Sequence, residues 1–219
     1  MLELQLPSPV DRRPLRLLCL GAHCDDIDIG CGGTLLKLLS AGRKWDITWV
    51  VFSASVERAR ELRNSAKRFL RNAVQSRVIT HEFRDSFFPA QYESVKQAFV
   101  ALKQLPDPDL IFTHHRADLH QDHRIVSELT WNAFRRHLIL EYEIPKYDGG
   151  LVPTNVYVRL DKRQVEAKIR TLMSCYRSQL AKPWFTPDTF RGIMRLRGIE
   201  SGGEDGWAEG FHGHKLCVA

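Results

Sequence analysis

The stretch LRLLCLGAHCDDIDIGCGGTLLKLLSAGRKWDITWVVFS, residues 15–53, predicts a strand, a helix and a second strand. Residues 15–22 and 47–53 are apolar runs of strand length, and the second run is rich in β-branched and aromatic residues. Residues 32–42, between them, have the pattern of a helix that ends at a glycine. A strand, a helix and a strand in this order form the unit from which parallel sheets are built.

The rest of the chain continues this alternation. Further helices are predicted over residues 55–72, 91–105, 124–134, 165–176 and 191–198, and further strands over 77–83, 109–113, 138–144, 155–160 and 211–218. Four successive strand–helix units predict an α/β fold, a Rossmann-like three-layer arrangement with a mostly parallel central sheet and helices on both faces. Because no internal repeat or long linker interrupts the pattern, we expect a single domain over residues 1–219.

The composition is that of an ordinary globular protein. Of the 219 residues, 43% are hydrophobic and 26% are charged, which excludes a disordered chain. The 32 Lys and Arg residues exceed the 26 Asp and Glu residues by six, and this mild positive charge does not indicate a nucleic-acid partner. We therefore expect a small-molecule partner and no nucleic acid.

Two further absences concern the cellular compartment. No apolar run approaches the roughly 18 residues of a membrane span, and the N-terminal stretch lacks the pattern of a signal peptide. The five cysteines form an odd set without CxxC spacing, which favours a reducing compartment over a disulfide framework. A cytoplasmic protein without a membrane span is expected, and the sequence allows a homo-oligomer.

Histidines and aspartates concentrate in two loops. In open α/β sheets, ligands bind beyond the carboxyl ends of the strands near the point where the strand order reverses. The loops after the strands at 15–22 and 109–113 hold five of the nine histidines and five aspartates. A catalytic metal site needs three nitrogen or oxygen ligands, a separate carboxylate as general base and a donor for the developing oxyanion. These two loops contain enough groups for all three roles.

The two loops also resemble a known family. His23-Cys24-Asp25-Asp26, followed by a glycine-rich stretch over residues 30–35, is similar to the AHPDDxExGxGGTL signature of the LmbE/PIG-L deacetylases. Residues 120–123, HQDH, resemble the second motif of that family, HxDH. Residues 58–61, 176–179 and 207–211 resemble weaker family stretches, so the similarity runs over most of the chain.

The resemblance implies a zinc-dependent hydrolase that removes an acyl group, usually acetyl, from the amino group of a sugar-containing substrate. His23, Asp26 and His123 would bind the metal, with Zn²⁺ as the default and Fe²⁺ as the alternative. Asp25 would be the general base that deprotonates the water activated by the metal.

The resemblance also implies roles for the second motif. His120, in its protonated form, would stabilise the oxyanion and is a candidate proton donor to the leaving amine, with Asp122 either orienting its ring or supporting its charge. Four further residues have either a substrate-binding or a structural interpretation, and as a hypothesis we place them at the substrate: Arg58, His114, Asp118 and Glu209.

Two positions depart from the family pattern. Cys24 stands where the family usually has proline, and its thiol is a candidate competing ligand for the metal. Asp28 stands where glutamate is commonest; it keeps the charge but has a shorter reach.

The sequence therefore predicts a metal-dependent N-deacetylase acting on an acetamido sugar or sugar conjugate. Another metallohydrolase, an esterase or phosphoesterase, is the nearer alternative. A non-catalytic sugar-binding module is the more distant one, because it would be expected to lack Asp25 or His120. The identity of the sugar and of its aglycone stays open.

Overall fold

The computed structural model describes residue 1, residues 3–6 and residues 13–217. Within these residues, seven strands form one sheet: β1 (Leu15–His23), β2 (Trp45–Ser53), β3 (Gln75–Thr80), β4 (Leu110–His114), β5 (Leu138–Tyr142), β6 (Val156–Arg159) and β7 (Ala208–Gly213). The helices are α1 (Asp26–Ser40), α2 (Val56–Phe69), α3 (Tyr92–Leu102), α4 (Gln121–Ala133), α5 (Lys162–Cys175) and α6 (Pro187–Glu200). Two short 3-10 helices, η1 (Phe88–Gln91) and η2 (Arg177–Gln179), lie in the connections.

The strand order is β3-β2-β1-β4-β5-β7-β6. Strands β1 to β5 pair in parallel, whereas β7 runs antiparallel to both of its neighbours, β5 and β6. The predicted α/β fold with a mostly parallel sheet is therefore confirmed.

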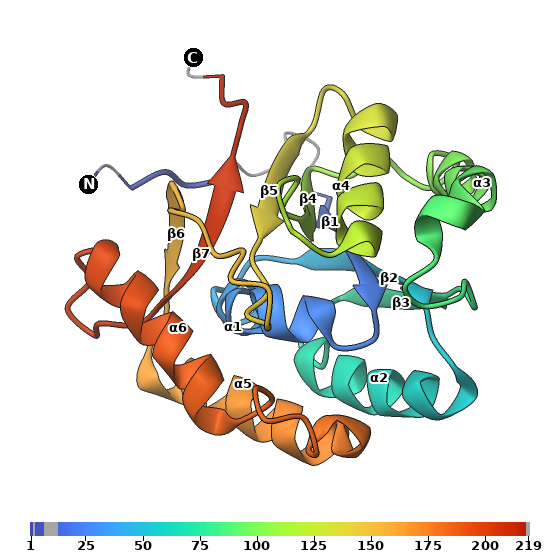
Figure 1. The fold of residues 1–219 in the computed structure, drawn as a ribbon. Coiled ribbons are helices and arrows are strands. Elements are labelled where there is room, and N and C mark those ends of the chain that lie inside the picture. The colour runs from blue at the N-terminus through green and yellow to red at the C-terminus, as the bar shows by residue number, and fades with distance from the viewer. Residues whose placement is uncertain (2, 7–12, 218–219) are drawn as a thin grey trace.

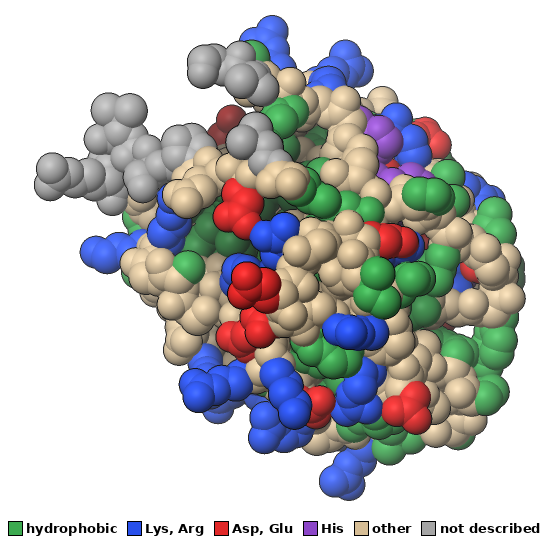
Figure 2. All heavy atoms as spheres, turned by 90° about the vertical axis from the view of Figure 1, so that its left-hand side faces the viewer, with side chains coloured by type: hydrophobic (Ala, Val, Ile, Leu, Met, Phe, Trp, Pro, Cys, Tyr) green, Lys and Arg blue, Asp and Glu red, His purple; other side chains and the backbone are tan. Residues whose placement is uncertain are grey.

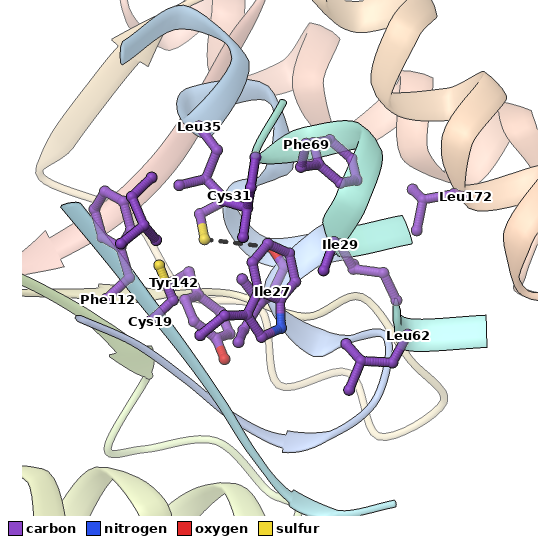
Figure 3. Packing of buried hydrophobic residues seen from close by; sticks show 14 of the residues in the cluster. Cys19, Ile27, Ile29, Cys31, Leu35, Leu62, Phe69, Phe112, Tyr142 and Leu172 are labelled. Atoms are coloured by element: carbon purple, nitrogen blue, oxygen red, sulfur yellow. Dashed lines mark hydrogen bonds between the residues drawn. The ribbon is translucent and has the colours of Figure 1, made fainter. Parts of the chain in front are cut away.

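Helices cover both faces of the sheet (Figure 1). Alternate residues of a strand point to opposite faces, and in β1 Leu17 and Cys19 join one buried cluster while Leu18 and Leu20 join the other. The first cluster packs α1, α2, α5 and α6 against the sheet, and the second packs α3 and α4. Figure 3 shows part of the first cluster, where Phe69 of α2 lies near α1. Burial on both faces explains why the central strands are almost continuously apolar.

Strands β1 and β4 are neighbours, although α1, β2, α2, β3 and α3 separate them along the chain. The chain proceeds from β1 to β2 on one side and from β4 to β5 on the other, so the strand order reverses between them. The loops that follow β1 and β4 consequently meet at one edge of the sheet, which is where ligands bind in such folds.

Four helices begin earlier than predicted, among them α5, at Lys162 instead of residue 165, and α6, at Pro187 instead of residue 191. Helix α1 begins at Asp26 instead of at residue 32, and it contains a kink at Cys31, where φ is −142°. Helix α4 begins at Gln121 instead of at residue 124, with His120 as its N-cap. The glycines at 30, 32 and 33 weaken the helical signal, but the tertiary structure needs them because a Cβ at Gly30 would overlap the ring of Tyr142.

The last strand also differs from its prediction. It covers Ala208–Gly213 instead of residues 211–218, and residue 218 lies outside the described residues, as do positions 2 and 7–12 of the N-terminal stretch. Among the described residues, no helix combines the length and apolar character needed to cross a membrane.

Candidate active site

Three side chains bring ligand atoms together at the carboxyl edge of the sheet. His23 ends β1, Asp26 begins α1 and His123 lies in the first turn of α4. His23 Nδ1 is 3.2 Å from His123 Nε2 and 3.4 Å from Asp26 Oδ2. The distance between His123 Nε2 and Asp26 Oδ2 is 3.6 Å. In a tetrahedral zinc site, bonds of about 2.0–2.1 Å place neighbouring ligand atoms about 3.4 Å apart. The three atoms thus fit one divalent metal ion.

Asp26 is held as a carboxylate. Its Oδ2 accepts a hydrogen bond of 2.7 Å from the backbone N–H of His23 and lies 3.1 Å from His114 Nε2. Burial favours a higher pKa for Asp26, but the surrounding histidines outweigh burial and hold the pKa well below its ordinary value. Asp26 therefore keeps the negative charge that a metal ligand needs.

Asp118 and Lys146 orient His123. The Nδ1 of His123 is 3.0 Å from Asp118 Oδ2, and Lys146 Nζ lies 2.8 Å from the same carboxylate. Burial, together with the neighbouring His114, lowers the pKa of His123 to about 3, so its ring is neutral. With the proton on Nδ1, the lone pair of Nε2 points to the metal position, as in many carboxylate–histidine–metal arrangements.

His23 has carboxylates on its other ring nitrogen. Its Nε2 lies 3.0 Å from Asp85 Oδ1 and 3.2 Å from Asp122 Oδ2. Burial lowers the pKa of His23, but Asp26 and these two carboxylates raise it more, and the net pKa lies well above its ordinary value. The two carboxylates at Nε2 thus orient the ring so that Nδ1 points toward Asp26 and His123.

Asp25 directly precedes the candidate ligand Asp26 and accepts a hydrogen bond from Arg58. The guanidinium Nη2 of Arg58, in the first turn of α2, donates a hydrogen bond of 2.6 Å to Asp25 Oδ1. Burial raises the pKa of Asp25, and the positive charge of Arg58 offsets only part of this effect. A carboxylate with a raised pKa is better suited to accept a proton near neutral pH than an ordinary aspartate.

The second motif is arranged differently from expectation. His120 Nδ1 accepts a hydrogen bond of 3.2 Å from the backbone N–H of Asp122, while the carboxylate of Asp122 accepts from the backbone N–H groups of Ser86 and Phe88. Burial and the nearby His23 lower the pKa of His120, although Asp122 opposes this shift. The expected pairing that would keep His120 protonated is absent, because the Asp122 carboxylate holds the loop after β3.

Sequence reasoning missed Asp85. Its side chain is 68% exposed at the mouth of the site, yet its carboxylate contacts His23. The next residue, Ser86, has φ of +65°, a conformation uncommon for a non-glycine residue. The topology could have indicated Asp85, because the loop that contains it begins at the carboxyl end of β3.

His114 and Glu209 are both buried. His114 lies beneath the ligands, with its ring stacked on that of His123 at 3.8 Å and with Nε2 2.9 Å from the backbone nitrogen of Ala22. Glu209 lies outside the ligand cluster: its carboxylate accepts hydrogen bonds from the backbone of Gly33 and from Lys168 Nζ. The kink in α1 frees the N–H of Gly33, and Glu209 satisfies it.

The two departures from the family pattern have structural explanations. Asp28 is fully buried and accepts hydrogen bonds from Ser65 Oγ and Tyr176 Oη, and burial raises its pKa to about 7. Cys24 Sγ faces the backbone oxygen of Ser53, and burial raises the pKa of its thiol to about 12. A protonated thiol turned toward a carbonyl does not compete for the metal.

Comparisons with known proteins point to one family of deacetylases. Residues 18–134 match the family model PIG-L: GlcNAc-PI de-N-acetylase. The uncharacterized deacetylase YaiS of Escherichia coli (strain K12) is 32% identical over 158 residues, which cover 66% of this chain and 82% of YaiS.

Two solved structures share the fold at low identity. The N,N'-diacetylchitobiose deacetylase from Pyrococcus horikoshii superposes with a TM-score of 0.65 and 20% identity, covering 91% of this chain and 83% of that one. GalB, the 4-carboxy-2-hydroxymuconate hydratase from Pseudomonas putida KT2440, gives a TM-score of 0.72 at 14% identity, covering 94% and 98%. A deacetylase and a hydratase thus share this architecture, so the activity depends on the site residues.

Proposed function

Because the chain belongs to the PIG-L family and is a deacetylase of that family, we propose that it removes the acetyl group from the amino nitrogen of an acetamido sugar or sugar conjugate. Family membership favours amide hydrolysis over the esterase, phosphoesterase and sugar-binding alternatives. The observation that carries the proposal is the triangle of His23, Asp26 and His123, with Asp25 beside it.

The metal ligands in this proposal are His23, Asp26 and His123. Zinc is the first choice, and iron(II) is the alternative because two imidazoles and a carboxylate suit both ions. When bound, such an ion polarises a carbonyl oxygen and lowers the pKa of water. Asp118 supports the ligand His123, so we assign it a positioning role instead of substrate contact.

Asp25 accepts the proton of the attacking water. Arg58 binds Oδ1 and so fixes the orientation of the carboxylate, while burial keeps the pKa of Asp25 above that of an exposed aspartate. A base whose pKa is closer to neutral passes its proton on more readily to the departing amine.

His120 stabilises the oxyanion by donating a hydrogen bond, while the proton for the departing amine comes from Asp25. Its Nδ1 accepts from the Asp122 backbone, so the proton of the neutral ring is on Nε2. The ring centroid lies 4.9 Å from that of His23 and 4.6 Å from that of His123, close enough for Nε2–H to serve a substrate bound at the ligands. Asp122 acts through the backbone and the loop that it holds.

The substrate's hydroxyl groups meet Arg58 and Asp85 at the mouth of the site. Arg58 is partly exposed, and Asp85 presents an ionised carboxylate because the hydrogen bond to His23 lowers its pKa. Charged and polar side chains at the rim of a site commonly determine the orientation of a polar ligand. His114 and Glu209 are buried and support the site indirectly: His114 packs against the His123 ring, and Glu209 of β7 binds the backbone of α1.

The test is acetate release from N-acetylglucosamine in free, nucleotide-linked and glycoside-linked form, by the zinc-loaded protein. Asp25→Asn should reduce the rate by roughly 100-fold or more, because it removes the base without changing the shape of the side chain. Asp107→Asn, at an exposed aspartate that pairs with His137, is the matched control and should leave the rate unchanged. Undiminished release by Asp25→Asn would refute the role of Asp25, and no release from any acetamido sugar would refute the substrate class.

A further inference from the structure

A second group of histidine and carboxylate side chains lies on the neighbouring strands. His115 directly follows β4, Glu141 belongs to β5 and His214 directly follows β7. His115 Nδ1 lies 2.9 Å and His214 Nε2 lies 3.0 Å from the same atom, Glu141 Oε2. None of these residues belongs to the ligand triangle at His23, Asp26 and His123.

Oxygen Oε2 of Glu141 is surrounded by more nitrogen atoms than it has lone pairs for hydrogen bonds. The backbone nitrogen of Arg116 is also 3.0 Å from it, so three nitrogens approach an oxygen that has two lone pairs. The other oxygen, Oε1, binds Trp131 Nε1 at 2.6 Å and Arg116 Nε at 3.1 Å. These two bonds fix the orientation of the carboxylate.

We propose that His115 Nδ1, Glu141 Oε2 and His214 Nε2 form a second binding site for a divalent transition-metal ion of the zinc type. The three atoms lie within 4.8 Å of one another, and two imidazoles with one carboxylate are a common donor set for such ions. A metal ion between the rings and the oxygen replaces the crowded hydrogen bonds with bonds to one centre. Because a tetrahedral site needs about 3.4 Å between ligand atoms, the rings move outward by a few tenths of an ångström.

His212 provides an independent observation at the same place. It lies opposite Glu141 in the pairing of β5 with β7, and its ring stacks on that of His115 at 3.8 Å. The His212 side chain is 7% exposed, and its Nε2 is buried without a hydrogen-bond partner among the described residues. A buried imidazole thus packs directly against the His115 ring, with a nitrogen that the described residues leave without a partner.

The proposed site is open to solvent on one side. The His214 side chain is 31% exposed, whereas Glu141 is fully buried. Figure 2, which faces the side of the molecule where β6, β7 and α6 lie, shows histidine side chains at the surface next to basic side chains. An ion can therefore enter from solvent, and its binding joins the segment after β7 to strands β4 and β5. An ion that binds the native state and not the unfolded state stabilises the fold.

The experiment is titration of the metal-free protein with Co²⁺, followed by its visible absorption, and with Zn²⁺, followed by metal analysis after gel filtration. The wild type should bind two ions per chain at micromolar concentration. His214→Ala should bind one, and a His23→Ala/His123→Ala variant should also bind one, because each removes a different site. His137→Ala, which removes a histidine paired with the single carboxylate of Asp107, should still bind two.

Thermal unfolding adds a readout that does not depend on activity. Zn²⁺ should raise the Tm of the His23→Ala/His123→Ala variant and should not do so once His214→Ala is added. Anomalous scattering at the zinc edge from wild-type crystals should place the second ion between His115 and His214, and this measurement needs no variant. Binding of a single ion by the wild type, or a second ion that His214→Ala retains, would overturn the proposal.

Discussion

Asp118 shows how one carboxylate connects the parts of the catalytic site. It accepts a hydrogen bond from His123, forms an ion pair with Lys146 and accepts a hydrogen bond from the backbone N–H of His120. It therefore fixes both the proposed metal ligand His123 and the start of α4. The hydrogen bond from His123 and the Lys146 charge outweigh the effect of burial and lower the pKa of Asp118.

Replacing Asp118 by asparagine should weaken metal binding by about 10-fold to 100-fold, because the hydrogen bond that orients His123 loses its charge. Competition with a zinc chelator measures the affinity. The control is Asp107→Asn, since Asp107 also pairs with a histidine but lies away from the ligands. If Asp118→Asn held zinc as tightly as the wild type, the orientation of His123 would not depend on this bond.

Helix α1 begins at the candidate site and has a glycine-rich centre. Asp26 and Asp28 lie in its first turn, and Gly30 packs against the ring of Tyr142 from β5. Tyr142 in turn donates a hydrogen bond to the backbone oxygen of Leu20. The glycine allows the helix to approach the sheet closely enough to bring its first turn to the ends of β1 and β4.

Gly30→Ala should destabilise the fold by about 2 kcal/mol, because the added methyl group overlaps the Tyr142 ring in a packed core. Gly192→Ala in α6 is the matched control: a methyl group added there would meet no atom of the described residues within 4 Å, so the change should be neutral or stabilising by up to about 1 kcal/mol. Urea unfolding of both variants measures the difference. Equal stability of the two variants would show that the contact at Gly30 is not tight.

At the scale of the elements, the sequence predicted most strands and helices but misplaced the start of α1. Periodicity located the strands because buried strands need apolar runs. Gly30 and Gly33 are required by Tyr142 of β5 and Glu209 of β7, which are more than 100 residues away, and Gly32 lies against Phe69 of α2. A local pattern carries no information about such neighbours.

At the scale of the whole molecule, a contact also joins β1 and β4 at the ends opposite the site. Arg13, just before β1, binds both carboxylate oxygens of Asp109 at 2.6 and 2.7 Å, and the backbone N–H of Arg16 donates to the same group. The hydrogen bond from Arg13 lowers the pKa of Asp109 in the folded state. This contact joins the starts of the two strands whose far ends carry the site.

Asp109→Asn should lower the free energy of unfolding by about 1 kcal/mol at pH 7. A carboxyl group whose pKa is lowered on folding stabilises the fold above its unfolded pKa of about 3.9, and this contribution is lost as the pH falls through the folded value. The difference between wild type and variant should therefore shrink between pH 5 and pH 3, as measured by urea unfolding at several pH values. A difference that stays constant over this range would contradict the charge-based explanation.

From the sequence alone one can predict the order of the elements, the class of the fold and the two loops that hold the candidate ligand residues. These depend on local apolar patterns and on the rule that parallel strands end at a common edge. The contacts of Asp85 with His23, of Glu209 with α1 and of His115 and His214 with Glu141 become visible only in the folded protein. Such contacts join segments far apart in the chain, and strand register and packing between the layers determine them.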